Sequence, residues 1–300
     1  MKRWLAGAVL ALAAFGQTRP KRAVRVVLGG DIMLARFVWM TAQQHKDPAW
    51  PFQKIAAVFR EADLAFANLE SPFAESGPYF EDRMVFRTHP SMVEGLLAAG
   101  IDVVSTANNH SRDVGPRGIE FTLEHLKQHG IAGVGTVRGP AEKHEGVVIE
   151  RKGVRFGFLA YTFDQRNGNH LNDDPRVAMM NVASLPSDIA ALRAKCDVVI
   201  VSMHAGVEYV PRPNAQQTRF ARAAIDAGAT VVVGHHPHVF QPAERYKDGV
   251  IFYSLGNLVF DQLERPGVRQ GAIAEVDFLG SQLAGYLIRH VTIRNTVPQL

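Results

Sequence analysis

Three histidines, His235, His236 and His238, stand within the short segment V-G-H-H-P-H-V-F-Q. Ordinary packing gives no reason to concentrate imidazoles in this way. In an extended chain, residues two apart project to the same face, so His236 and His238 are predicted to point together. Neutral imidazole is a common ligand of Zn, Mn or Fe, and the segment therefore predicts part of a metal site.

Acidic, amide and further imidazole side chains follow other predicted strands. Taken singly, a carboxylate at a strand end is more often a helix cap, and a lone histidine is more often a satisfied core residue. In an open α/β sheet, however, the carboxyl ends of the strands form the edge at which ligands bind. Agreement among five strand ends favours chelation of a divalent ion. Besides the histidine segment, the residues concerned are Asp31, Asn68, Glu70, Asn108, Asn109, His110 and His204.

Seven apolar runs rich in β-branched residues, each bounded by Gly, Asp, Asn or Pro, predict the strands that position these side chains. Helix-period segments, including Pro90–Ala99 and Pro116–His129, lie between several of them. This alternation predicts an α/β protein with largely parallel strands. The final runs, A-I-A-E-V-D-F-L-G and L-A-G-Y-L-I-R-H-V-T-I, have no helix between them and predict an antiparallel hairpin. One domain, over residues 24–295, is expected.

The N-terminus has the pattern of a secretory signal. Lys2 and Arg3 precede an apolar run from Trp4 to Phe15, and small residues precede Gln17. We therefore predict a signal peptide over residues 1–16 and an extracytoplasmic location, whether periplasmic, secreted or at the cell surface. The run is shorter than the about 20 residues that a spanning helix needs. A retained anchor is the alternative, and contact with a membrane is expected only through an uncleaved signal.

The composition sets limits on function. With 300 residues and 47% hydrophobic content, the chain can bury a sizeable core. Its net charge of +4 is small, and the lack of a Lys and Arg cluster argues against a nucleic-acid partner. Cys196 is the single cysteine, so no disulfide can form within the chain. A thiol nucleophile is conceivable there, but a buried residue at a strand entrance is the better interpretation.

Several blocks of the chain resemble the CapA-type proteins, which are named for poly-γ-glutamate capsule synthesis and are related to the calcineurin-like metallophosphoesterases. The resemblance covers nearly the whole mature chain and implies a metallophosphatase-like α/β fold, a four-layer α/β/β/α sandwich of two mixed sheets. The blocks are G-D-I-M-L-A-R, A-N-L-E-S-P, G-I-D-V-V-S-T-A-N-N-H-S-R-D-V-G, H-A-G-V-E-Y, G-A-T-V-V-V-G-H-H-P-H-V-F-Q-P-A-E and I-F-Y-S-L-G-N-L-V-F.

The resemblance implies one or two divalent ions, Zn, Mn or Fe, and a ligand set for each. It assigns Asp31, Glu70 and His238 to the first ion, and Glu70, as a bridge, with Asn109, His204 and His236 to the second.

The motif that reads G-D-x-H in the wider superfamily is here G-D-I-M, so Met33 replaces an imidazole. A thioether suits these metals poorly. We therefore hypothesise that the second ion binds firmly and that the first is weak, exchangeable or absent.

The resemblance also implies that His110 stabilises the transition state or protonates the leaving group, as in phosphoesterase relatives. Asp113 could orient His110, because a positioned imidazole needs a partner on its other nitrogen, but a plain loop cap is an equal alternative. His235 stands where the wider superfamily has glycine, and its role is open.

Three further residues are candidates for contact with substrate. Arg87 and Arg112 could bind an anion, since guanidinium pairs with carboxylate or phosphate in bidentate fashion. Either could equally form a surface ion pair. Asn257, in Y-S-L-G-N, is predicted at the same edge of the sheet.

Two classes of function fit these patterns. The first is an exported metal-dependent hydrolase, in which the ion activates water and His110 acts as general acid. The bond broken could be a phosphoester, or an amide or ester of a capsule polymer. The second is a non-catalytic accessory protein that holds an anionic polymer such as poly-γ-glutamate during export or attachment. The hydrolase is favoured, because His110 has no evident task in a structural site. A plain sugar-binding protein has no need for the histidine segment.

Overall fold

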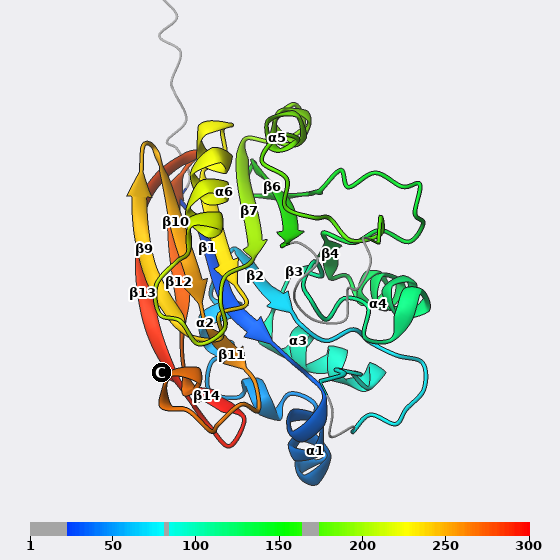
Figure 1. The fold of residues 1–300 in the computed structure, drawn as a ribbon. Helices are drawn as coiled ribbons and strands as arrows, with labels where there is room; N and C mark the ends of the chain where they lie inside the picture. The colour runs from blue at the N-terminus through cyan, green and yellow to red at the C-terminus, as the bar shows by residue number, and fades with distance from the viewer. Residues whose placement is uncertain (1–22, 81–83, 164–173) are drawn as a thin grey trace, which may run out of the picture.

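The computed structural model describes residues 23–80, 84–163 and 174–300, so the predicted signal peptide at residues 1–16 lies outside the described residues. Two β-sheets pack face to face, and helices cover their outer sides (Figure 1). The first sheet has the order β14-β13-β12-β1-β2-β3-β4, with β11 beside β1, and the second has the order β5-β6-β7-β8-β10-β9.

The strands of the first sheet are β1 (Ala23–Ile32), β2 (Leu64–Leu69), β3 (Val103–Ser105), β4 (Ala132–Val134), β11 (Asn257–Val259), β12 (Gln270–Leu279), β13 (Gln282–Arg294) and β14 (Val297–Gln299). Those of the second are β5 (Val147–Arg151), β6 (Val154–Thr162), β7 (Val198–His204), β8 (Val231–His235), β9 (Phe240–Tyr246) and β10 (Gly249–Leu255). The α-helices are α1 (Arg36–His45), α2 (Ala56–Arg60), α3 (Val93–Ala99), α4 (Gly115–Gln128), α5 (Leu185–Arg193) and α6 (Ala215–Asp226), and short 3-10 helices cover Trp50–Phe52, Pro90–Met92 and Pro266–Arg269.

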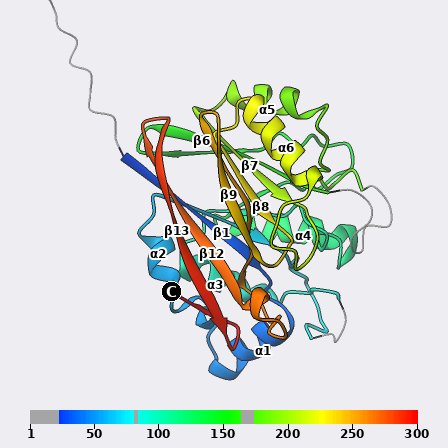
Figure 2. The same ribbon diagram turned by 60° about the vertical axis from the view of Figure 1, so that its left-hand side comes forward.

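Period-two alternation in the strands divides the apolar residues among three cores. Along β1, Val26 and Leu28 face the core between the sheets, whereas Val27 joins the core beneath α1, α2 and α3. On the opposite side, α5 and α6 pack on the outer face of the second sheet. Figure 2 shows these two helices on one side of the molecule and α2 and α3 on the other. The predicted four-layer α/β/β/α sandwich is confirmed.

Both sheets are mixed. In the first sheet, β1 pairs parallel with β2 and antiparallel with β12. In the second sheet, β10 pairs parallel with β8 and antiparallel with β9. The predicted C-terminal hairpin is confirmed, since β12 and β13 pair antiparallel. The parallel strands β1, β2, β3, β7 and β8 direct their carboxyl ends to the same end of the molecule, which is the lower end in Figure 1. This common end positions the polar residues of the strand ends.

A close approach between β8 and β10 requires a glycine beside the histidine segment. A Cβ at Gly234 would lie 1.9 Å from the carbonyl oxygen of Tyr253. We therefore expect Gly234→Ala to reduce the free energy of unfolding by about 1–3 kcal/mol, as overpacked cores do, when urea denaturation is measured. Gly285→Ala on β13 is the control, because its Cβ would meet nothing within 4 Å. Equal stability of the two variants would contradict this account of the packing.

Candidate metal centre

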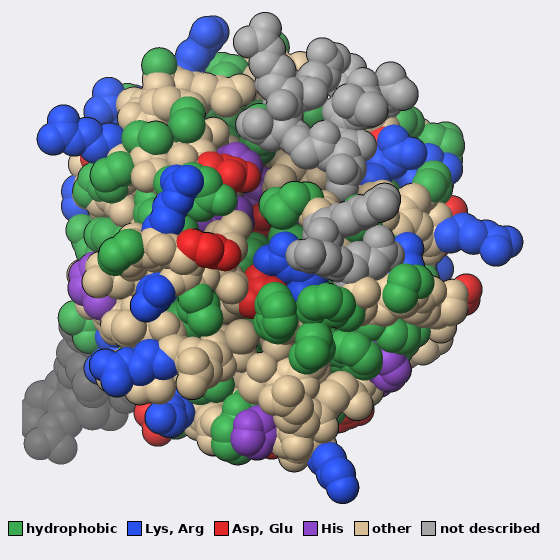
Figure 3. All heavy atoms as spheres, turned by 60° about the horizontal axis from the view of Figure 1, so that its bottom comes forward, with side chains coloured by type: hydrophobic (Ala, Val, Ile, Leu, Met, Phe, Trp, Pro, Cys, Tyr) green, Lys and Arg blue, Asp and Glu red, His purple; other side chains and the backbone are tan. Residues whose placement is uncertain are grey.

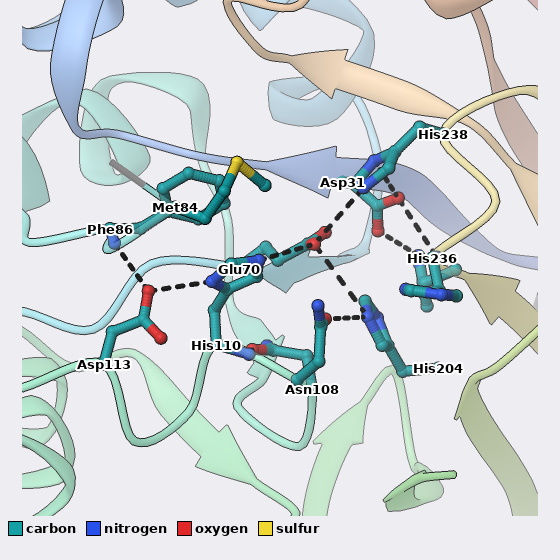
Figure 4. A network of polar contacts seen from close by, with 12 residues as sticks. Asp31, Glu70, Met84, Phe86, Asn108, His110, Asp113, His204, His236 and His238 are labelled. Carbon is teal, nitrogen blue, oxygen red and sulfur yellow. Dashed lines mark hydrogen bonds and ion pairs between the residues drawn. The ribbon is translucent and has the colours of Figure 1, made fainter. Parts of the chain in front are cut away.

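The strand ends converge on one buried polar cluster (Figure 4). Near the middle of the molecular face in front of these strand ends, acidic and basic side chains crowd together with a histidine visible between them (Figure 3). All of the predicted ligands and the predicted general acid are at most 4% exposed: Asp31, Glu70, Asn109, His110, His204, His236 and His238. The cluster is therefore buried, and it lies beneath the molecular face that Figure 3 shows.

The Glu70 carboxylate occupies the middle of the cluster. Its Oε1 atom lies 3.6 Å from His238 Nε2, 3.9 Å from His204 Nε2 and 4.0 Å from His110 Nε2. Burial raises the pKa of Glu70 well above its usual range, and the Asp31 charge adds to this effect. Among the described residues Oε1 has no hydrogen-bond partner.

A divalent cation fits these surroundings. A buried carboxylate oxygen without a donor is costly, and a cation bound beside it would remove that cost. Ligands bound to one Zn ion at 2.0–2.1 Å in a tetrahedral arrangement lie roughly 3.4 Å apart, close to the separation of Glu70 and His238. The residues present therefore suit a metal ion.

Asp31 stands at the carboxyl end of β1, where its carboxylate accepts hydrogen bonds from Asn68 Nδ2 at 2.9 Å and from the backbone N–H of His236 at 3.2 Å. Burial acts to raise the Asp31 pKa, but the imidazoles of His235 and His238 and the Asn68 amide outweigh burial and bring the pKa below its usual value. His235, whose role the sequence left open, lies with Nδ1 3.3 Å from Asp31 Oδ1. Asp31, Glu70 and His238 offer ligand atoms within 4.8 Å of one another, which is the set predicted for the first ion.

The path by which His236 and His238 reach the site differs from the prediction. Only His235 belongs to β8, whereas His236 and His238 have φ values of 94° and 57° and form a turn after the strand. The extended geometry assumed from the sequence is wrong for these two residues. Left-handed backbone is unfavourable for residues other than glycine, and here hydrogen bonds such as Tyr209 N–H to the Pro237 carbonyl, at 2.8 Å, hold the turn.

Burial also sets the charge state of the imidazoles. It lowers the pKa of His236 to about 3, with the nearby His238 as the next cause. Burial likewise lowers the pKa of His238, and it brings that of His204 well below the usual value. These rings are therefore neutral near pH 7, which is the form that binds a metal ion.

Asn257 determines which nitrogen of His238 faces the cluster. The Asn257 Nδ2 group donates to the Val268 carbonyl, so its Oδ1 is the atom that meets His238 Nδ1, at 2.9 Å. Nδ1 must then carry the hydrogen, and Nε2 keeps its lone pair toward Glu70. Asn257 is fully buried and contacts His238 on the ring nitrogen opposite Nε2. Its predicted contact with substrate stays a prediction.

We expect Asn257→Leu to weaken binding of the ion at His238 by roughly 10–100-fold, because partners that orient a ligand have effects of that size. Asn257→Asp, which retains an acceptor for Nδ1, should lose less. Equilibrium dialysis with Zn²⁺ would measure both. Equal affinities of the leucine and wild-type proteins would exclude this orienting role.

The residues predicted for the second ion also come together. His204 ends β7, with Nε2 2.7 Å from Asn109 Oδ1 and its ring centroid 4.9 Å from that of His236. Beneath them, Asn108 Nδ2 donates to Asn68 Oδ1 at 3.2 Å, and the Asn68 amide reaches both Asp31 and His204. Sequence reasoning grouped these two asparagines with the candidate metal-binding residues at the edge of the sheet but assigned neither to an ion. The structure makes them a support beneath the ligands.

His110 and Asp113 form a pair at the side of the cluster (Figure 4). His110 Nδ1 lies 2.8 Å from Asp113 Oδ2, which also accepts a hydrogen bond from the Phe86 backbone N–H. The Phe86 ring stacks on the imidazole, with centroids 3.9 Å apart. The ring orientation of His110 is thus held from two sides, and its Nε2 faces Glu70.

The two arginines predicted to bind an anion contact residues outside the set of candidate ligands. Arg112 forms an ion pair with Asp174 at 2.9 Å, and Arg87 donates to the Pro78 carbonyl. Their contact with substrate stays a prediction. Cys196 is buried in the core beneath α5 and α6, and burial raises the pKa of its thiol, which disfavours a nucleophilic thiolate.

Sequence reasoning missed one acidic residue of the cluster. Glu208 lies in the loop between β7 and α6, and a carboxylate oxygen lies within 4.8 Å of a ring nitrogen of both His236 and His238. Glu208 is half-buried, whereas the predicted ligands are buried. The sequence feature that could have identified Glu208 is its position four residues after His204, in the segment that follows a predicted strand.

Residues 25–262 match the family described as bacterial capsule synthesis protein PGA_cap. The chain belongs to this capsule synthesis family. It is 34% identical over 237 residues to the PGA biosynthesis protein CapA of Bacillus subtilis, covering 78% of this chain and 62% of that protein. Identity to the capsule biosynthesis protein CapA of Bacillus anthracis is 30% over 258 residues, with 81% and 61% coverage. The chain thus spans about three-fifths of the length of these family members.

The fold of this family member is shared with solved phosphoesterase-type structures. A Staphylococcus aureus protein assigned as a 5'-nucleotidase superposes with a TM-score of 0.56 at 12% identity, covering 91% of this chain and 55% of that chain. At that identity the similarity establishes a common metallophosphatase-like fold. Within the described part of the chain, no helix combines the length and apolar character needed to cross a bilayer.

Proposed function

We propose that this protein is an exported, metal-dependent hydrolase of the phosphoesterase type that acts on an anionic substrate of capsule-polymer metabolism. The observation that carries the proposal is the buried Glu70 Oε1 atom, which has three imidazole nitrogens within 4.0 Å and, among the described residues, no hydrogen-bond donor. Export is inferred from the signal pattern at residues 1–16.

Asp31, Glu70 and His238 would hold one ion. Glu70 with Asn109, His204 and His236 would hold the other. A bound Zn, Mn or Fe ion supplies Lewis acidity toward the electrophile and lowers the pKa of water to near 7. Burial of these ligands excludes bulk water, which strengthens every charge interaction at the site.

His110 would act on the leaving group. Its Nδ1 hydrogen is engaged by Asp113, so Nε2, which faces Glu70, is the nitrogen that can give a proton to the departing oxygen. Asp113 keeps this tautomer. Stacking by Phe86 keeps the ring in place during the transfer. This arrangement favours catalysis over a purely structural metal site.

The names of two relatives and two arginines support the proposed substrate class. Two relatives are named for biosynthesis of PGA or of a capsule, which supports a link to poly-γ-glutamate or to a phosphoester intermediate of capsule assembly. Arg87 and Arg112 are the candidate guanidinium groups for such an anion.

The alternative is an accessory protein that uses the metal to hold an anionic polymer without cleaving it. It is kept as a second candidate because the two relatives are named for biosynthesis and not for hydrolysis. The protein beginning at Gln17, loaded with Mn²⁺ or Zn²⁺, would be incubated with bis-p-nitrophenyl phosphate, p-nitrophenyl phosphate and poly-γ-glutamate. Turnover that chelator abolishes would support the hydrolase. Metal-dependent binding of the polymer without any turnover would favour the accessory protein instead.

A further inference from the structure

The loop that carries Glu208 is fastened to the histidine turn. The backbone N–H of Tyr209 donates to the Pro237 carbonyl at 2.8 Å, and the Gln241 side chain donates to the carbonyls of Val210 and Arg212. These contacts join the chain immediately after Glu208 to the segment that contains His236 and His238. The position of its carboxylate near both histidines is therefore built into the packing.

His236 supplies an independent observation at the same place. It is 1% exposed, and its Nδ1 atom has no hydrogen-bond partner among the described residues. A buried ring nitrogen without a partner is costly and uncommon in native structures. A bound cation would satisfy it, as it would the similarly unpartnered Glu70 Oε1.

His238 limits how many ions this part of the cluster can hold. Its Nδ1 is bonded to Asn257, so a single lone pair, on Nε2, is available to a metal. Two groups of candidate ligands share this residue: Asp31 and Glu70 belong to one, and Glu208 and His236 belong to the other. One nitrogen binds one ion. The two groups do not form a single set within 4.8 Å, so the half-buried Glu208 side chain would have to move toward Asp31 and Glu70 to reach the same ion.

Met33 explains why this ion needs a further ligand. Its side chain is fully buried in the core beneath α1, and its sulfur accepts a hydrogen bond from the Ala35 backbone N–H, so it contributes nothing to the cluster. The first ion is then left with three of the predicted ligands.

We propose that Glu208 is a metal ligand that completes the coordination of the ion at His238, in place of the imidazole that Met33 removes. This inference rests on the proposed function only in requiring that the site binds a divalent ion. Because Glu208 is the half-buried member of the set, it would bind the ion from the side that faces solvent. The ion at His238 would then be firmly held, contrary to the weak binding expected from Met33.

The test compares Glu208→Gln, which keeps the shape of the side chain and removes its charge, with Glu264→Gln. Glu264 is an exposed carboxylate whose charge also acts on Tyr209, so its removal matches the change in charge at this face without touching the ligand group. Binding of Mn²⁺ would be titrated by electron paramagnetic resonance, and bound metal would be counted by mass spectrometry. Thermal unfolding in chelator would verify that each variant folds.

We expect Glu208→Gln to weaken binding of one ion on the order of 100-fold, because loss of a ligand should cost at least as much as loss of a partner that only orients a ligand. We expect Glu264→Gln to leave the affinity unchanged. Glu208→His should restore binding with a preference for Zn²⁺ over Mn²⁺. Wild-type affinity in Glu208→Gln would overturn the role of Glu208 and leave the proposed function intact. A wild-type protein that binds no ion would refute both.

Discussion

A protein carrying His238→Ala is expected to lose tight binding of a divalent ion, with affinity reduced more than about 100-fold, and to lose turnover with it. His238 Nε2 is the imidazole nitrogen nearest to Glu70 Oε1, at 3.6 Å, and belongs to both groups of candidate ligands. Removing a ligand should exceed the roughly 10–100-fold effect of removing a partner that orients one. Metal content after dialysis, measured by mass spectrometry, reports the loss.

His290→Ala is the matched control for this experiment, because His290 is exposed on β13, outside the cluster. The double variant with His236→Ala should be no better than His238→Ala alone. Undiminished metal content in the double variant would show that the histidine turn does not bind metal, and the hydrolase mechanism would have to be abandoned.

Replacement of His110 by Ala is expected to lower kcat by roughly 10²–10⁴-fold, the usual contribution of a general acid, while metal content stays unchanged. The physical reason is that His110 contacts Asp113 and Phe86 and presents Nε2 to the cluster without being needed as a ligand. Asp113→Asn should have a smaller effect, because it leaves the imidazole in place but weakens control of its tautomer. Steady-state kinetics with a phosphodiester would be measured beside metal content.

Two outcomes would count against this role. Full activity in His110→Ala would mean that another group protonates the leaving oxygen. Loss of metal in the same variant would instead make His110 a ligand, which its 4.0 Å separation from Glu70 does not require.

Much of the fold could be predicted from local patterns. The helix-period segments Pro90–Ala99 and Pro116–His129 correspond to a 3-10 turn with α3 and to α4, because an apolar stripe repeats along a helix regardless of its partners. The hairpin of β12 and β13 was also predictable from a local pattern, because the two apolar runs follow each other with no helix between them. The two-sheet arrangement came from resemblance, because periodicity does not state which strands pair.

The candidate site was predictable in its residue types and less so in its geometry. Asp31 and His204 end strands and Glu70 directly follows one, so their place at the carboxyl ends of parallel strands was predictable. His204 belongs to the other sheet, however, so it meets Asp31 and Glu70 only because the two sheets pack together. The histidine turn was described wrongly, because positive φ values at His236 and His238 depend on hydrogen bonds from another loop rather than on their own side chains. Glu208 was missed because it follows no strand directly.

By itself, the sequence determined the apolar periods, the polar residues at strand ends and the family, since each is a property of neighbouring residues or of their order. Only the tertiary structure decided that Asn257 orients His238 and that Glu208 faces the histidines. The Asn257 contact crosses 19 residues of chain, and Asp31 meets His236 across 205. Such contacts are selected by packing of two whole sheets against each other, and no local pattern encodes which side chains that packing brings within reach.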